Sequence, residues 1–296
     1  MTMDRRSFLK LSGAGLGAVF LDSAAVIPAL GAEKRLAMLY DNSKCIGCRA
    51  CQMACKQWNK LGPVSTDPQH LYESPGDLTP DAWTLIGLAE YKVNDRRNWL
   101  FINKGCMHCG NPACVAVCPT SALKKQPNGL VTYDRGLCNG CGYCTQFCPF
   151  HVPRLQVSSQ FAGVAKSSKC TFCQDRVANN LRPFCIQSCP AGALDWGDRG
   201  TMIEQAKSRV EALKAGDFPQ ANLYGENTLG GLGRLYVLLA PPTAYSLPQD
   251  PGFPFAATLW KKVVQPAGEV AFGAVLLGLL AAFFVVRRNV HMEEVE

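Results

Sequence analysis

The stretch CIGCRACQMAC, from Cys45 to Cys55, places four cysteines within eleven residues. Its spacing, Cys-x2-Cys-x2-Cys-x3-Cys, wraps three thiols around one compact body and adds a fourth at a fixed offset. Three further groups follow, so the sixteen cysteines of the 296-residue chain form four groups of four. The other groups are Cys106, Cys109, Cys114 and Cys118; Cys138, Cys141, Cys144 and Cys148; and Cys170, Cys173, Cys185 and Cys189.

Cysteines this dense serve disulfides, zinc or iron–sulfur clusters. The even count invites disulfides, and paired CxxC sequences invite zinc. Cysteines separated by two residues do not easily bridge each other, and neither alternative explains three cysteines in seven residues with a fourth at fixed offset. Neither explains the proline that follows Cys118, Cys148 and Cys189. We therefore interpret the groups as ligands of four [4Fe-4S] clusters.

The net charge of +7 fits this interpretation. A four-iron cluster with four thiolates carries roughly −2, so four of them would roughly offset the excess of basic residues. The lysines and arginines are dispersed, without a basic helix carrying interleaved aromatic residues, so we expect no nucleic-acid partner.

Repeated flanking sequences sort the groups into two kinds. A Tyr-Asp pair precedes Cys45 and Cys138 at the same distance, whereas CPTSAL at 118–123 matches CPAGAL at 189–194. Groups one and three are thus one kind, and groups two and four the other. Asn128-Gly129 predicts a hairpin turn between groups two and three, the layout of a bacterial two-cluster ferredoxin.

The predicted fold class is α+β, with two ferredoxin-like units of which one is inserted in the other. Groups two and three form the inner unit, and groups one and four form the outer unit with strands at 36–40 and 193–197. Pairing group one with two and three with four remains open. The predicted segments are a signal (1–32), the first outer half with an insertion (33–96), the inner unit (97–160), the second outer half (161–200), a helix and extended arm (201–265), a transmembrane helix (266–288) and a tail (289–296).

The last cysteine of such a group ligates the neighbouring cluster, and we expect it to begin a helix that points it away. This rule predicts the four ligand sets. They are Cys45, Cys48, Cys51 and Cys189 (set one); Cys55, Cys170, Cys173 and Cys185 (set two); Cys106, Cys109, Cys114 and Cys148 (set three); and Cys118, Cys138, Cys141 and Cys144 (set four).

The two ends of the chain predict export and membrane anchoring. Arg5-Arg6 with the following Ser-Phe-Leu-Lys resembles a twin-arginine export signal, and a short apolar run follows it. Residues 270–286 carry no charge, and with 267–269 they reach the roughly 30 Å needed to cross a bilayer as a helix. A buried core helix fits less well because the run has no polar face.

The remaining segments carry weaker signals. Residues 56–105 are expected to be mostly loop, apart from a strand at 83–93 that covers a cluster or contacts a partner. A capping box at Thr201 predicts a helix, followed by an extended arm at 217–265 with one strand, 235–239. His108 is expected to be a loop residue with its ring near solvent rather than a cluster ligand, since four thiolates are already supplied.

These motifs resemble the iron–sulfur β subunit of membrane-bound formate dehydrogenases, which belongs to the four-cluster subunits of molybdopterin oxidoreductases. The sequences that carry the resemblance, from about residue 36 to 288, are CIGCRACQMACKQWN, CMHCGNPACVAVCPTSALKK, CNGCGYCTQFCPFHVPR and CTFCQDRVANNLRPFCIQSCPAGAL.

The resemblance implies a non-catalytic role with no catalytic residues. The subunit would pass electrons from a molybdenum or tungsten catalytic subunit to a membrane cytochrome b and quinone. It would sit in the inner membrane as a single-pass protein, with its bulk on the periplasmic side. The chain departs from the family in carrying its own twin-arginine signal, as the ferredoxin-like subunits of membrane [NiFe] hydrogenases do, which leaves a hydrogenase or another molybdopterin reductase as the alternative.

Overall fold

The computed structural model describes residues 35–72, 74–93, 96–157 and 165–289. The predicted signal at 1–32 and nearly all of the predicted tail lie outside these ranges.

A four-stranded sheet joins the beginning of the chain to two distant segments. Strand β1 (Leu36–Asp41) pairs antiparallel with β8 (Leu194–Asp198) and parallel with β10 (Arg234–Leu238). Strand β9 (Asn222–Tyr224) adds to the other side of β10, which gives the order β8-β1-β10-β9. All five residues of β10 are buried, as expected for a strand covered on both faces.

The predicted pairing of strands 36–40 and 193–197 is confirmed by the register of β1 and β8. The prediction of an extended arm at 217–265 is wrong, because β9 and β10 from this segment complete the sheet. The strand predicted at 235–239 is confirmed by β10, but its place in the central sheet was missed, because glycines and prolines flank it closely.

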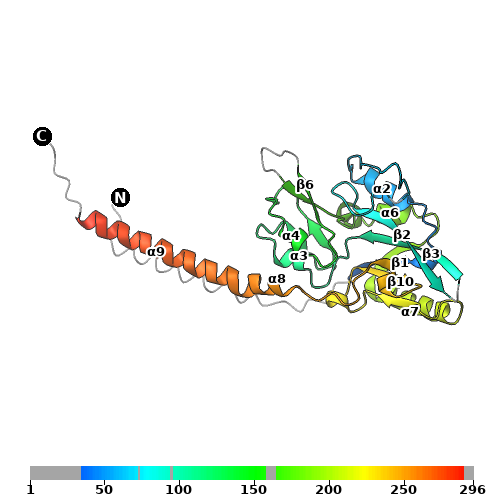
Figure 1. Cartoon of the computed structure of the whole chain (residues 1–296). Coiled ribbons are helices and arrows are strands. Elements are labelled where there is room, and N and C mark those ends of the chain that lie inside the picture. Colours follow the sequence, from blue (N-terminus) through cyan, green and yellow to red (C-terminus); the bar gives the residue numbers. More distant parts are fainter. Residues whose placement is uncertain (1–34, 73, 94–95, 158–164, 290–296) are drawn as a thin grey trace. The chain divides into compact units, whose positions relative to one another are not determined.

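Helix α7 (Arg199–Lys214) packs along the sheet (Figure 1). It buries an apolar face made of Met202, Ala206, Val210 and Leu213. The N-cap is Asp198, whose Oδ1 accepts the backbone N–H groups of residues 200 and 201 at 3.0 and 3.3 Å. The predicted start at Thr201 is therefore wrong: β8 leads directly into the helix, and the strand's last carboxylate caps it.

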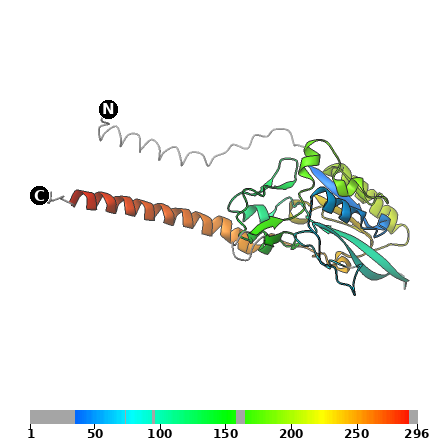
Figure 2. The same cartoon turned by 90° about the horizontal axis from the view of Figure 1, so that it is seen from above.

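The long hairpin of β2 (Thr84–Val93) and β3 (Arg96–Gly105) contacts the sheet strands through hydrogen bonds (Figure 2). Strand β2 confirms the prediction at 83–93, but β3 lies in a segment expected to be loop. Charged residues at both ends of β3 hid its alternation.

Two smaller hairpins hold the second and third cysteine groups. Strands β4 (Leu123–Lys125) and β5 (Val131–Tyr133) flank the predicted turn, in which Gly129 has φ +87°. This confirms the predicted hairpin. The other pair is β6 (Arg154–Val157) with β7 (Ala165–Ser168), which the sequence did not indicate.

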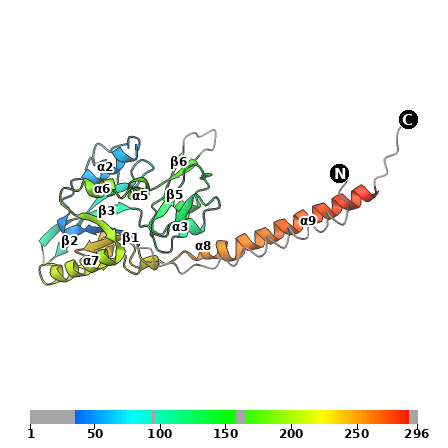
Figure 3. The same cartoon turned by 180° about the vertical axis from the view of Figure 1, so that it is seen from behind.

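Short helices carry or follow the cysteines. They are α2 (Ala50–Trp58), α3 (Ala113–Ala116), α4 (Tyr143–Gln146), α5 (Gln174–Ala178) and α6 (Phe184–Gln187), with 3-10 turns η1 (Asn42–Lys44), η2 (Thr228–Gly230) and η3 (Pro242–Tyr245). Helices α2 and α6, from groups one and four, lie side by side (Figure 3) and bring the rings of Trp58 and Phe184 within 5.4 Å.

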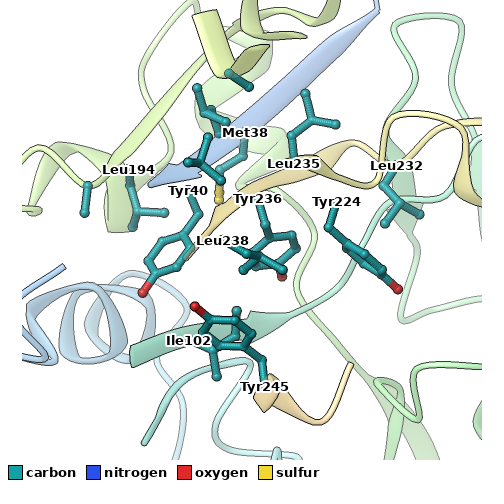
Figure 4. Close-up of a cluster of buried hydrophobic side chains, with 14 of the residues drawn as sticks. Met38, Tyr40, Ile102, Leu194, Tyr224, Leu232, Leu235, Tyr236, Leu238 and Tyr245 are labelled. Carbon is teal, nitrogen blue, oxygen red and sulfur yellow. The ribbon is translucent and has the colours of Figure 1, made fainter. Parts of the chain in front are cut away.

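Buried tyrosines line the core beneath the sheet (Figure 4). The rings of Tyr40 and Tyr224 each meet that of Tyr236 edge-on, at 5.8 and 6.2 Å. Each hydroxyl finds a partner: Tyr40 donates to the carbonyl of Phe101, Tyr224 to that of Pro248, and Tyr236 to that of Asn103. Such pairing lets a buried tyrosine contribute apolar area without an unsatisfied polar atom.

The described part of the chain has one helix long and apolar enough to cross a membrane. It runs without a break through α8 (Phe255–Leu259), the π-helical turn η4 (Trp260–Val264) and α9 (Gln265–Asn289). Its mean hydropathy reaches 2.4, and no residue of its most apolar stretch is buried. The predicted span at 266–288 falls within α9, and the helix begins eleven residues earlier.

Candidate iron–sulfur sites

All four cysteine groups share one local geometry. The residue before the second cysteine has a positive φ in each: Gly47 (+67°), His108 (+46°), Gly140 (+78°) and Phe172 (+59°). The third cysteine is the second residue of a short helix in each: Cys51 in α2, Cys114 in α3, Cys144 in α4 and Cys185 in α6. The expectation that the fourth cysteine begins the helix is therefore wrong, because the helix begins five residues before it in each group.

The helix starts separate the groups into the two kinds that the flanking sequences predicted. In groups one and three the N-cap residues, Arg49 and Gly142, are left-handed. In groups two and four the N-cap is a proline, Pro112 or Pro183. Groups one and three also place glycine at the positive-φ position, and glycine adopts this left-handed conformation at little cost.

Groups two and four place large side chains at that same position. His108 and Phe172 adopt a left-handed backbone that costs about 1–2 kcal/mol for a residue other than glycine. Their rings meet edge-on at 5.2 Å, so the two strained positions pack against each other. The prediction that the His108 ring lies near solvent is wrong, because the side chain is buried.

The thiols of set one surround a small cavity. Cys45, Cys48, Cys51 and Cys189 line it together with Tyr40. Burial raises the pKa of the Cys51 thiol to about 12, and the thiols of the other three cysteines add to the rise. The thiols of Cys45 and Cys189, which are 144 residues apart in the sequence, thus line the same cavity.

The thiols of sets two and three gather in the same way. Burial raises the pKa of Cys55, and all three other members of set two raise it further. Burial likewise raises the pKa of Cys114, with further contributions from the three other members of set three. The members are Cys55, Cys170, Cys173 and Cys185 in set two, and Cys106, Cys109, Cys114 and Cys148 in set three.

Three cysteines of set four pack beside the hairpin of β4 and β5. Burial raises the pKa of Cys144, and Cys138 and Cys141 raise it further. Cys118 and Cys138 pack against the same apolar cluster as Cys144. The structure thus places thiols of each predicted set near one another, with Cys48 and Cys141 exposed, and the assignment of cysteines to shared clusters stays a prediction.

Hydrogen-bond donors surround the sulfur atoms. Asn103 Nδ2 donates to Cys51 Sγ at 3.3 Å, and the backbone N–H groups of Ser167 and Phe172 donate to the Sγ atoms of Cys138 and Cys170 at 3.4 Å. Such donors stabilise charge on sulfur and tune the potential of a bound cluster. The sequence showed none of them. Asn103 and Ser167 lie 52 and 29 residues from the cysteines they contact, and the Phe172 contact depends on the local turn between Cys170 and Cys173.

Further buried polar atoms have no partner in the described residues, and an absent cofactor would explain them. They are His108 Nε2, Tyr133 OH, Thr145 Oγ1, and the Nε and Nη2 atoms of both Arg49 and Arg234, besides Trp260 Nε1. An unsatisfied buried donor costs about 1–3 kcal/mol. Most of these residues neighbour cysteines, so inorganic sulfide beside the thiols would supply acceptors.

The alternatives weighed from the sequence fit these sites less well. None of the sixteen cysteines, all of which are described, forms a disulfide. Within the described ranges, no three His, Cys, Asp or Glu side chains converge on a point that would hold a single metal ion. A tetrahedral zinc site needs that convergence, whereas a four-iron cluster needs thiols spread around a larger body.

Comparison with known proteins agrees with the assignment of the cysteines as iron–sulfur ligands. The formate dehydrogenase iron–sulfur subunit of Haemophilus influenzae is 38% identical over 266 residues, which cover 88% of this chain and 83% of the relative. The chain belongs to the family of formate dehydrogenase iron–sulfur subunits. The nitrate-inducible formate dehydrogenase iron–sulfur subunit of Escherichia coli K12 is 36% identical over 89% of this chain and 90% of its own length.

Family models described as a 4Fe-4S dicluster domain match residues 44–122 and 97–199. Two such domains and sixteen cysteines support [4Fe-4S] clusters, and the dicluster descriptions imply four. Because the matches overlap at 97–122, they do not divide the groups between units. Membership in the iron–sulfur subunit family supports a role in electron transfer.

A second kind of relative is also similar. The hydrogenase-2 operon protein HybA of Escherichia coli O157:H7 is 32% identical over 332 aligned positions, which cover 97% of this chain and 96% of that protein.

Proposed function

We propose that this subunit is the non-catalytic electron conduit of an exported formate dehydrogenase. It would carry four [4Fe-4S] clusters between a molybdopterin catalytic subunit with molybdenum or tungsten and a membrane cytochrome b that serves quinone. When bound, each cluster supplies a site that takes up and releases an electron. The observation that carries the proposal is that thiols from distant segments come together, as those of Cys45, Cys48, Cys51 and Cys189 do around one cavity.

The proposed ligands follow the gathering of the thiols. They are Cys45, Cys48, Cys51 and Cys189; Cys55, Cys170, Cys173 and Cys185; Cys106, Cys109, Cys114 and Cys148; and Cys118, Cys138, Cys141 and Cys144. The cysteines hold the iron, the surrounding N–H groups stabilise the charge on sulfur, and the apolar side chains between the sets exclude water.

The sets form a series. Set one adjoins set two, because Cys51 contributes to the raised pKa of Cys185, after burial and the nearer cysteines. Set three adjoins set four, because Cys144 contributes in the same way, after burial, to the raised pKa of Cys148. Sets two and three share a neighbour in Arg234, which interacts with Cys170 and Cys106. Neighbouring sites in series are what an electron conduit requires.

The two ends of the series differ in their surroundings. At set one the exposed Cys48 is accompanied by Ile46 and Met53, which are 64% and 61% exposed. At set four Tyr143, next to Cys144, packs edge-on against Trp260 at the start of the long apolar helix. We propose that set one faces the catalytic subunit and set four faces the membrane partner.

The nested arrangement of two ferredoxin-like units is part of the proposal. It is supported by the pairing of β1 with β8 and by the closed hairpin of β4 and β5, which lies between them in the sequence. It assigns residues 33–96 and 161–200 to the outer unit and 97–160 to the inner unit.

We propose a periplasmic location for the bulk of the chain, with α9 as a single-pass anchor and the tail in the cytoplasm. The Arg5-Arg6 motif and the apolar α9 support it. Replacing both arginines with lysine should keep the chain in the cytoplasm, as measured by fractionation. Normal delivery of that variant would contradict export by the chain's own signal.

Iron and acid-labile sulfide analysis tests the central proposal. The full chain, purified anaerobically from its membrane, should contain about sixteen irons. Four or fewer irons would contradict it.

A second candidate function is the same role in a [NiFe] hydrogenase. The similarity to HybA over 97% of the chain favours it, as does the twin-arginine motif that this chain carries. The metal that copurifies decides between them: molybdenum or tungsten supports formate dehydrogenase or another molybdopterin enzyme, and nickel supports hydrogenase.

A further inference from the structure

Arg234 is a fully buried arginine in the middle of the molecule. It opens β10, and its side chain has 0% exposure. The guanidinium lies against the backbone of Gly105, where a Cβ would come within 2.6 Å of Nη1 and 2.8 Å of Nη2. The absence of a side chain at Gly105 therefore makes room for the cation next to Cys106.

Only part of this guanidinium is satisfied by protein atoms. Nη1 donates to Asn103 Oδ1 at 2.6 Å and to the Asn103 carbonyl at 3.3 Å. Nε and Nη2 have no partner in the described ranges. No carboxylate of the described residues lies within 4.0 Å of the guanidinium. A buried cation without a counter-charge is strongly unfavourable, so the fold with this arginine is incomplete without an anion.

The groups that face the cation come from three cysteine sets. Burial lowers the pKa of Arg234, but Tyr236 and the thiols of Cys170, Cys185 and Cys106 outweigh burial and raise it. In return, burial raises the pKa of the thiols of Cys51, Cys55 and Cys185, and Arg234 opposes that rise in all three. One guanidinium thus lies beside sets one, two and three.

Asn103 connects this cation to set one. Its side chain is 1% exposed, its Oδ1 accepts from Arg234, and its Nδ2 donates to Cys51 Sγ at 3.3 Å. Tyr236, which donates to the Asn103 carbonyl, also reaches Met107 Sδ at 3.4 Å beside Cys106. The cation is therefore held in place by side chains that themselves contact the cysteine groups.

We propose that Arg234 is the shared counter-cation of cysteine sets one, two and three, and that its unpartnered N–H groups donate to sulfur at these sites, which favours the reduced state of each. The inference rests on the proposed four clusters. When an electron arrives at the iron of a site, no bond forms or breaks, and Arg234 keeps its proton. A fixed positive charge in a poorly solvated interior stabilises the added negative charge.

Redox titrations followed by electron paramagnetic resonance of the purified full chain test the proposal. In Arg234→Gln, the equilibrium between reduced and oxidised forms should shift at least tenfold toward oxidised at two or more sites, which is about 59 mV for a one-electron step. Arg234→Lys keeps the charge and should shift the same sites less, in the same direction. Iron content is measured in parallel for every variant.

Arg199→Gln is the matched control. The Arg199 guanidinium is also partly buried and donates to the carbonyls of Leu232, Gly225 and Glu226, but no cysteine affects its pKa. Its loss removes comparable hydrogen bonds from the same part of the fold. The equilibrium between reduced and oxidised forms should stay within twofold of the parent's at all four sites.

Asn103→Asp keeps the test decisive if Arg234→Gln loses iron. The aspartate has the same shape as the residue it replaces, and its carboxylate neutralises Arg234 while facing Cys51. The site of Cys51 should shift at least tenfold toward oxidised. If Arg234→Gln retains about sixteen irons yet titrates like the parent, or if Asn103→Asp shows no shift, the proposal is overturned. A parent protein with four or fewer irons would instead overturn the proposed function.

Discussion

The sheet region and the hairpin region of this protein differ in the size of their apolar cores. The sheet region comprises β1, β8, β9 and β10 with α7, and the hairpin region comprises α3, β4, β5 and α4. Thirty buried apolar side chains form the cluster around the sheet, whereas five form the cluster in the hairpin region. A small core supplies little stability, and small domains need staples such as metal sites. We infer that the sheet region holds its fold largely through packing, whereas the hairpin region depends on what its thiols bind.

Removal of iron should give the largest change in stability, and this change should differ between the two regions. After anaerobic chelation, the amide protons of β4 and β5 should lose protection in hydrogen exchange. Their small apolar cluster alone cannot offset the conformational entropy that the chain loses on folding. The amide protons of β1 and β10 should keep most of theirs. The untreated holoprotein is the control, and equal loss of protection in both pairs would contradict the distinction.

Single cysteine substitutions should sharpen the comparison. Cys51→Ala and Cys144→Ala should each remove about four irons of sixteen. Only Cys144→Ala, in the hairpin region, should also make residues 113–146 sensitive to protease, since the sheet around Cys51 stays packed. Cys189→Ala should abolish the same paramagnetic signal as Cys45→Ala. Loss of different signals in that pair would show that set one is assigned wrongly.

Leu235→Ala should weaken the sheet region without changing the iron content. Leu235 is fully buried in β10, and truncating such a leucine typically costs about 2–5 kcal/mol. Thermal unfolding followed by circular dichroism should show a lower midpoint. Leu181→Ala, at a residue 48% exposed, is the control and should change the midpoint little.

The smallest effect should come from the cap of α7. Asp198→Ala removes the acceptor of two backbone N–H groups, which should cost about 1 kcal/mol. Thr201→Ala lies three residues further on and should change the midpoint less. If Thr201→Ala proved the more damaging of the two, the helix would begin where its sequence motif suggested.

Much of the site was predictable because its signals are local. Cysteine spacing, the Asn128-Gly129 turn and the repeated flanks each span a few residues. The structure confirms the hairpin and gathers the thiols predicted as set one around one cavity. The long apolar helix was predictable for the same reason. Ligand assignments and export remain predictions.

The missed features depend on contacts between distant segments. Nothing near Arg234 indicates that β10 pairs with β1, almost two hundred residues earlier, or that an arginine would be buried there. His108 was expected near solvent because histidine is polar, and its burial follows from packing against Phe172 of another group. Strand β3 is the exception: it pairs with the neighbouring β2, and it was missed because the residues at its ends are charged.

The parallel pairing of β1 with β10 also decides when the sheet can be completed. Every cysteine has been synthesised by residue 189, yet β10 begins only at residue 234. A chain that stops between these points has all of its thiols but leaves β1 with an open edge, and open edges recruit other chains. Premature termination in this interval should therefore produce an iron-competent protein that aggregates.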